Sequence, residues 1–325
     1  MNNRISWIDN ARFLAISCVV FGHVLGFLTN HNIEGYDLVQ GVIVSFNMPL
    51  FFVLSGFCSG KQLCALSDTI SWWKYVKKVT IRILLPSYVF SIITYLLGLS
   101  NGLFSSYWFL PILWRLLVIF SIITFLFNSF PKVKKYACRG GYYVAFLIAC
   151  QFLGNRTGEF CLYIIYGMFL HEFLNSRKTM SIIPFLFVIY IPTLFMTMGK
   201  NIYVPEFQYH KLILSSGWYI AVLRQICAIS ASTIIMVMFS KYAKGNYFIS
   251  KWGTMTLGIY LIHDFFIENL ASKHLLLCIP DYGSLVVYVI CISITVFAIL
   301  CSVCLIEMIR KNKISRILLL GELKK

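Results

Sequence analysis

The sequence has few charged residues, and acidic residues are especially scarce. Asp, Glu, Lys and Arg make up 12% of the 325 residues, with 12 acidic against 28 basic side chains. A soluble domain carries about 25% charged residues, so this chain lacks the polar surface that a soluble enzyme or a disordered chain requires. Apolar residues make up 59% of the chain and occur in long blocks. The composition therefore indicates a polytopic membrane protein.

The sequence also excludes two further classes, namely disulfide-stabilised proteins and nucleic-acid-binding proteins. The 11 cysteines form no regular framework, and most lie within apolar blocks as small buried side chains. The net charge of +16 does not indicate a nucleic-acid partner, because the basic residues lie between apolar blocks rather than on one soluble face. No low-complexity linker or repeat divides the chain, so we expect a single domain over residues 1–325.

Ten apolar segments predict an all-α bundle of about ten transmembrane helices. A helix needs about 20 residues to cross the hydrocarbon core, and the mean hydropathy of +0.79 suits a chain that is mostly within it. The fifth and sixth segments are short for a crossing. The predicted spans are 6–28, 41–60, 83–99, 108–127, 141–154, 160–175, 181–198, 217–240, 253–271 and 283–309.

The distribution of basic residues predicts the orientation of these spans. If the N-terminus lies inside, most Lys and Arg residues fall in inner connections and few in outer ones, which is the bias of cytoplasmic loops. We therefore expect both termini in the cytoplasm and a multi-pass protein of the cell membrane, in contact with its lipids. The connection between the second and third spans is expected to be a basic loop that contains Lys77, Lys78 and Arg82.

The first predicted helix carries polar residues with a suggestive spacing. Arg12 and His23 are about 20° from alignment after three helical turns, so their side chains face the same way, about 16.5 Å apart along the axis. Asp9 precedes Arg12 by one turn, where the two can pair. Polar groups within a membrane are costly and are commonly functional. For His23 the alternatives are a structural bond to a neighbouring helix and a role in a site.

Three more polar side chains within predicted spans are candidates for a site. Arg115 and Arg224 each need a partner in the membrane. Pairing with Asp264 or Glu268 on the ninth span is one interpretation, and contact with a sugar or a thioester is the other. His263 lies on that same span, directly before Asp264.

Five motifs in order along most of the chain resemble membrane acyltransferase family 3, and within it the fucose 4-O-acetylase-like polysaccharide O-acetyltransferases. The third motif departs from the family pattern, because Ile83 replaces a leucine and a single Arg is present. The motifs are Arg12 with ten residues before His23, Met48-Pro49-Leu50-Phe51-Phe52 with Ser55-Gly56, Arg82 to Pro86, Trp108-Phe109-Leu110, and Tyr260-Leu261-Ile262-His263.

The resemblance implies transfer of an acyl group, usually acetyl, from cytoplasmic acetyl-CoA to a sugar hydroxyl of a surface or exported polysaccharide. Acetyl-CoA is then a substrate rather than a tightly bound cofactor, and the acceptor is a carbohydrate or a lipid-linked glycan. Acyl transfer to an alcohol needs a base near neutral pH, and His is the side chain that titrates there. His23 therefore either deprotonates the hydroxyl or carries the acetyl group as a nucleophile.

From this resemblance, the remaining candidate residues are assigned to catalysis, to binding of the donor and to binding of the acceptor. Arg12 and Asp9 join His23 as catalytic candidates. The basic loop residues are candidates for binding the phosphates of coenzyme A, although the positive-inside bias alone would also place cations there. The candidates for binding the acceptor are Arg115, Arg224 and His263.

A membrane transporter or exporter of a glycan or small solute is the alternative function. Buried Arg and His residues would serve either role. The alignment of Arg12 with His23 and the basic loop favour the transferase. Inverted repeats would favour the transporter, and none is visible in the sequence.

Overall fold

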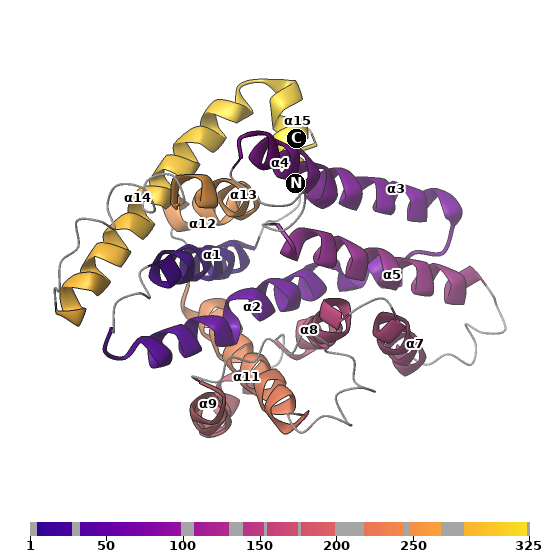
Figure 1. Cartoon of the computed structure of the whole chain (residues 1–325). Coiled ribbons are helices and arrows are strands. Elements are labelled where there is room, and N and C mark those ends of the chain that lie inside the picture. Colours follow the sequence, from indigo (N-terminus) through magenta and orange to yellow (C-terminus); the bar gives the residue numbers. More distant parts are fainter. Residues whose placement is uncertain are drawn as a thin grey trace.

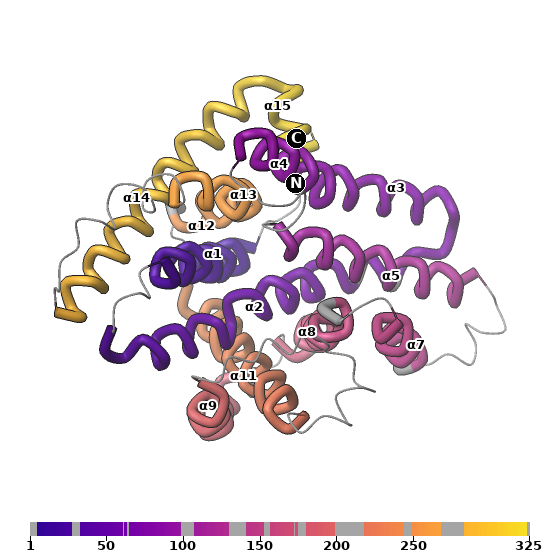
Figure 2. Tube along the Cα trace, viewed as in Figure 1, coloured from indigo at the N-terminus to yellow at the C-terminus, as the bar shows by residue number. Residues whose placement is uncertain are grey.

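The protein is described here by a computed structural model. The described residues are 5–27, 33–98, 107–129, 139–152, 155–174, 177–198, 218–243, 247–267 and 283–323. They form helices and short connections, with no strand among them (Figures 1 and 2). The expected all-helical architecture is confirmed.

Seven helices of the described residues are long and apolar enough to cross a membrane, so the chain is a multi-pass membrane protein. The helical segments α3, η1 and α4 together form one of these seven. They are α1 (Ser6–Phe27), α2 (Tyr36–Cys64), α3 (Thr69–Val79) with η1 (Thr80–Leu84) and α4 (Leu85–Leu96), α5 (Phe109–Ser129), α9 (Ile183–Thr197), α11 (Trp218–Tyr242) and α14 (Ser284–Arg310).

Helices outside this set of seven correspond to the other three predicted spans. The fifth and sixth correspond to α7 (Arg139–Phe152) and α8 (Asn155–Phe173), and the described part of the ninth corresponds to α13 (Thr256–Phe266), which follows the short helix α12 (Tyr247–Gly253). A 3-10 turn, η2 (Arg177–Ile182), precedes α9, and the helix α15 (Lys313–Leu320) follows α14. The number of crossings and the cytoplasmic location of both termini stay predictions.

The expected basic loop before the third span is wrong, because this segment is helical. Asp68 caps the N-terminus of α3, where its Oδ1 accepts a hydrogen bond from the Ser71 N–H at 2.8 Å. The hydrogen bonds from Ser71 also hold the pKa of the Asp68 carboxyl below its ordinary value. Tyr75 and Val79 are buried on one face of α3, so the segment is an amphipathic helix rather than a solvated loop.

A π turn, η1, joins α3 to α4, and a proline explains its position. Pro86 has no N–H with which to bond the Arg82 carbonyl four residues earlier, and its ring crowds that carbonyl. The N–H of Leu85 bonds to the Thr80 carbonyl, five residues back, which is the π pattern. The helix therefore widens at the turn that carries Arg82.

The helix α1 lies at the centre of the bundle (Figure 1). It contacts α2 and α11 on one side and α12, α13 and α14 on others. Ala11 and Ala15 are fully buried, and such small side chains allow membrane helices to approach closely. The helix α1 is thus packed against several other helices.

The helices α2 and α8 pack backbone against backbone. A Cβ atom on Gly56 would collide with the Ile164 carbonyl, and one on Gly167 would collide with the Val53 carbonyl. Only glycine at both positions permits this contact. The second motif of the sequence, which ends at Gly56, is therefore fixed against α8 while its other face is left for the site.

Candidate functional site

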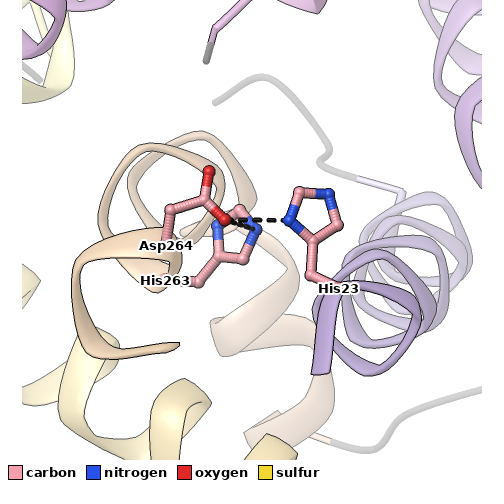
Figure 3. A group of neighbouring side chains, drawn as sticks. All are labelled: His23, His263 and Asp264. Atoms are coloured by element: carbon pink, nitrogen blue, oxygen red, sulfur yellow. Dashed lines mark hydrogen bonds and ion pairs between the residues drawn. The ribbon is translucent and has the colours of Figure 1, made fainter. Parts of the chain in front are cut away.

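A carboxylate of α13 joins two histidines from different helices (Figure 3). His23 Nδ1 on α1 lies 2.9 Å from Asp264 Oδ1 on α13. The same oxygen lies 3.1 Å from His263 Nε2. The rings of His23 and His263 are 5.1 Å apart between centroids. One carboxylate oxygen thus contacts both imidazoles.

The three side chains differ in their exposure. His23 is 43% exposed, Asp264 is 15% exposed, and His263 is fully enclosed. His263 Nδ1 donates to the Ile259 carbonyl at 3.0 Å, one turn earlier on α13, which fixes the ring behind Asp264. His23 is therefore the member of the group that a substrate can reach.

The contact with Asp264 orients His23. A carboxylate that accepts the Nδ1–H of an imidazole selects one tautomer and places the ring lone pair on Nε2. The same carboxylate stabilises the ring when it becomes positively charged. His23 with Asp264 is therefore the arrangement of a general base with a fixed orientation.

The donor atoms of His23, His263 and Asp264 lie within 4.8 Å of one another. Two imidazoles and a carboxylate are donors that Zn²⁺, Fe²⁺ and similar ions bind, so this group has the composition to hold such an ion. The 2.9 Å contact of His23 with Asp264 is also accounted for by a direct hydrogen bond.

Asp264 is the site residue that the sequence analysis did not assign. Its expected pairing with Arg115 or Arg224 is wrong, because its contacts are with the two histidines. Glu268 lies outside the described residues. A signal existed in the sequence, since His23 and Asp264 each sit within an apolar span and each needs a partner there.

A pocket of about 240 Å³ lies between α1, α2, α3, α5 and α13. Three cationic side chains line it, namely Arg12 from α1, Lys78 from α3 and Arg82 from η1. Lys77 is exposed on α3 but is not among the lining residues, because successive residues of a helix point about 100° apart. Arg12 is thus brought together with Lys78 and Arg82 from a distant part of the sequence, and Lys77 is not among them.

Contacts with residues of α1 and α2 hold the Arg12 guanidinium in this pocket. Its Nη1 lies 3.2 Å from Asp9 Oδ1, which confirms the expected pairing within α1. Its Nη2 lies 3.5 Å from Cys58 Sγ on α2. A Cβ atom on Gly253 would collide with the Asp9 carbonyl, so α12 packs directly on the backbone of α1 at this point. Asp9 is buried and acts on Arg12 rather than on the pocket.

The rest of the pocket lining combines apolar side chains with small polar ones such as Ser55 and Thr256, and it extends to the helix that bears Asp264. Its walls include Phe51, Phe109, Leu110 and Tyr260. Tyr260 lies one turn before His263 on α13, and their rings are 5.9 Å apart. His23, His263 and Asp264 are not among the lining residues, and Tyr260 is the lining residue whose ring lies beside a histidine of the group.

All five sequence motifs contribute to this pocket or to the histidine group. Arg12 and His23 come from the first motif and Arg82 from the third. Phe51 and Ser55 come from the second motif and line the pocket, as do Phe109 and Leu110 from the fourth and Tyr260 from the fifth. Segments spread from residue 12 to residue 264 thus contribute to two neighbouring groups, which meet at Tyr260 and His263.

Arg115 and Arg224 converge on the first turns of α8 instead. Arg115 Nη1 donates to Thr157 Oγ1 at 3.2 Å. Arg224 on α11 interacts electrostatically with Glu159, and the neighbouring Gln225 donates from Nε2 to the Glu159 carbonyl at 3.0 Å. These two candidates therefore share a location at α8, a different helix from those that bear the histidines.

Comparison with protein-family models gave one result that covers most of the chain. Residues 5–305 match the model of an acyltransferase domain. This range includes the pocket and the histidine group. Searches of curated proteins and of solved structures gave no match.

Proposed function

Since the chain belongs to the acyltransferase 3 family, it is a membrane enzyme that transfers acyl groups, and we propose that it moves an acetyl group from acetyl-CoA to a hydroxyl of a surface or exported glycan. The observation that carries this proposal is the pocket with three cations and an apolar lining that extends to the helix of Asp264. It joins a region suited to a nucleotide with a region suited to acyl transfer.

The pocket has the chemistry that acetyl-CoA requires. Phosphates are bound by Arg as a planar fork and by Lys as a point charge, and Arg12, Lys78 and Arg82 supply both. The apolar walls suit the slender pantetheine arm. Arg12 and His23 are about 16.5 Å apart along α1, a distance similar to the length of that arm. The thioester of a donor held by Arg12 would therefore reach the level of His23.

His23 and Asp264 supply the acid–base chemistry in this proposal. His23 Nε2 takes the proton of the acceptor hydroxyl while the hydroxyl oxygen attacks the thioester carbonyl. The carbon–sulfur bond then breaks, and coenzyme A leaves as a thiolate that accepts the proton from His23. Asp264 stabilises the imidazolium between these two steps. The enclosed ring of His263, held by the Ile259 carbonyl and 3.1 Å from Asp264 Oδ1, limits the movement of Asp264 from behind.

Arg115 and Arg224 are the proposed acceptor residues. Both lie at the first turns of α8, and Arg115 is exposed. Guanidinium groups donate several hydrogen bonds in a fixed geometry, which suits sugar hydroxyls and anionic glycan groups. This assignment rests on their shared location and on their chemistry.

We expect His23→Gln to lower glycan O-acetylation by about 10²–10⁴-fold, because glutamine can hydrogen-bond but cannot take a proton. Asp264→Asn should lower it by at least about tenfold, because a neutral amide does not stabilise the imidazolium. The measurement is mass spectrometry of the surface glycan at matched abundance of the protein in the membrane.

Asp37→Asn is the matched control for this pair of variants. Asp37 is an exposed carboxylate in the first turn of α2, and acetylation should stay near the wild-type level when it is changed. Wild-type acetylation in His23→Gln would show that His23 is not the base.

Lys78→Ala should raise the KM for acetyl-CoA by about threefold to fivefold while kcat changes little, because an exposed cation contributes modestly to ground-state and transition-state binding alike. Lys77→Ala removes the same charge from the next residue of the same helix and should leave KM near the wild-type value. Initial rates with purified protein in detergent measure both. Equal increases in KM would contradict the assignment of Lys78 to the pocket.

Cys58 offers a test of the donor pocket that does not depend on activity. It is exposed and lines the pocket beside Arg12. Bound acetyl-CoA should therefore slow its alkylation by N-ethylmaleimide by several-fold. Cys304 on α14, also exposed, lies outside the pocket lining and is the internal control. Peptide mass spectrometry reads both sites, and unprotected Cys58 at saturating acetyl-CoA would exclude this pocket as the donor site.

A further inference from the structure

We propose that the helix α15 and the residue that follows it, Gly321, position Arg82 for binding the acyl donor. The proposal rests on the assignment of the pocket to acetyl-CoA. It gives a role in the reaction to residues 313–322, which lie beyond the matched family domain. Gly321 acts through Arg82 and is therefore a positioning residue.

Arg82 lies on the least regular part of its helix. It belongs to the π turn η1, which Pro86 accounts for. A π turn lacks the uniform ladder of an α-helix, and such turns are frequent at functional sites. The direction of the Arg82 side chain therefore depends on what packs against the backbone of this turn.

Gly321 packs against that backbone. A Cβ atom on Gly321 would lie 2.5 Å from the Arg82 carbonyl oxygen, 2.7 Å from Arg82 Cα and 2.7 Å from the Ile81 carbonyl oxygen. All three atoms belong to the main chain of η1, so no flexible side chain can move aside. Gly321 also has a φ of +62° and ends α15 in the left-handed conformation. Glycine is thus required here twice, by conformation and by contact.

The helix α15 and the two residues that follow it, Gly321 and Glu322, form a tail that is fixed at both of its ends. Asn312 caps α15 through its Oδ1, which accepts from the Ile314 N–H at 2.8 Å. After Gly321, Glu322 binds Arg310 at the end of α14, with Oε1 at 3.0 Å from Nε and at 2.5 Å from Nη2. This paired, charge-assisted contact holds the end of the tail against the end of α14.

The tail also packs into the bundle. Leu320 is buried, and its Cδ2 would lie 3.1 Å from a Cβ atom on Gly258 of α13. On the opposite side of η1, Trp114 Nε1 of α5 donates to Thr80 Oγ1 at 2.9 Å. The π turn is therefore held from α5 at its first residue and from the tail at Arg82.

We expect Gly321→Ala to raise the KM for acetyl-CoA by about threefold to tenfold with kcat within about twofold of wild type, because a displaced Arg82 weakens a charge-assisted contact to the donor. Gly98→Ala is the matched control. Gly98 has a φ of +69°, and a Cβ atom added to it would meet no atom of the described residues within 4 Å, so it shares the backbone strain without the contact. The KM of this control should stay at the wild-type value.

A double-mutant cycle shows whether Gly321 acts through Arg82. Arg82→Ala alone should raise KM by about tenfold, and adding Gly321→Ala should raise it no further. An equal additional increase in that background would overturn the proposal, as would an unchanged KM in Gly321→Ala itself. If Arg82→Ala leaves KM unchanged, the donor pocket is wrongly assigned. If only Gly321→Ala leaves it unchanged, the role of the tail is wrong.

A second variant covers the case in which Gly321→Ala does not accumulate. Glu322→Gln removes the charge of the contact with Arg310 and should raise KM by about twofold to threefold. Glu307→Gln is its control, since Glu307 lies 3.8 Å from Arg310 and 3.1 Å from Lys251 and does not tie down the tail. A KM that is unchanged, or changed equally in both variants, would overturn the proposal.

Discussion

The contact of His23 with Asp264 connects the first helix of the bundle with the ninth predicted span. The two residues are separated by 241 positions, and their side chains meet at 2.9 Å. Both groups are costly in a membrane when they are alone, and the contact gives each of them a polar partner. It also fixes the imidazole beside His263, whose ring is 5.9 Å from that of the pocket residue Tyr260. The proposed chemistry depends on this contact, because it gives His23 its tautomer.

The arrangement of α1 relates the two ends of the site. Arg12 and His23 lie on one helix, so in the proposed mechanism a rigid element rather than a loop sets the distance between the donor phosphates and the site of acyl transfer. Asp9 and Gly253 hold the Arg12 end, and Asp264 holds the His23 end. In the same proposal, Lys78 of α3 and Arg82 of η1 join Arg12 in binding the donor phosphates. Of the three elements that bear these cations, η1 is the one without a regular α-helical ladder, which is why its packing against Gly321 has consequences for the donor.

The sequence was sufficient to predict the helical membrane architecture and part of the site. Long apolar blocks define membrane helices by a local rule, and the spacing of Asp9 with Arg12 is a property of one helix. The partner of His23 was not predicted, because a contact over 241 positions depends on how helices pack. The difference between Lys77 and Lys78 was missed for the same reason. The basic segment of α3 is a helix rather than the expected loop because Asp68 caps it and because Tyr75 and Val79 are buried, and the burial depends on how the helices pack.

The central claim is that one pocket binds the acyl donor, with its phosphates at the cations of α1, α3 and η1 and its thioester at the level of His23. An electron cryomicroscopy structure of the protein with bound acetyl-CoA tests it most directly. The account predicts phosphates of the donor at Arg12, Lys78 and Arg82, and the pantetheine arm along Phe109 and Tyr260. It also predicts that the thioester is within reach of His23. A donor bound at another surface, or a thioester remote from His23, would contradict it.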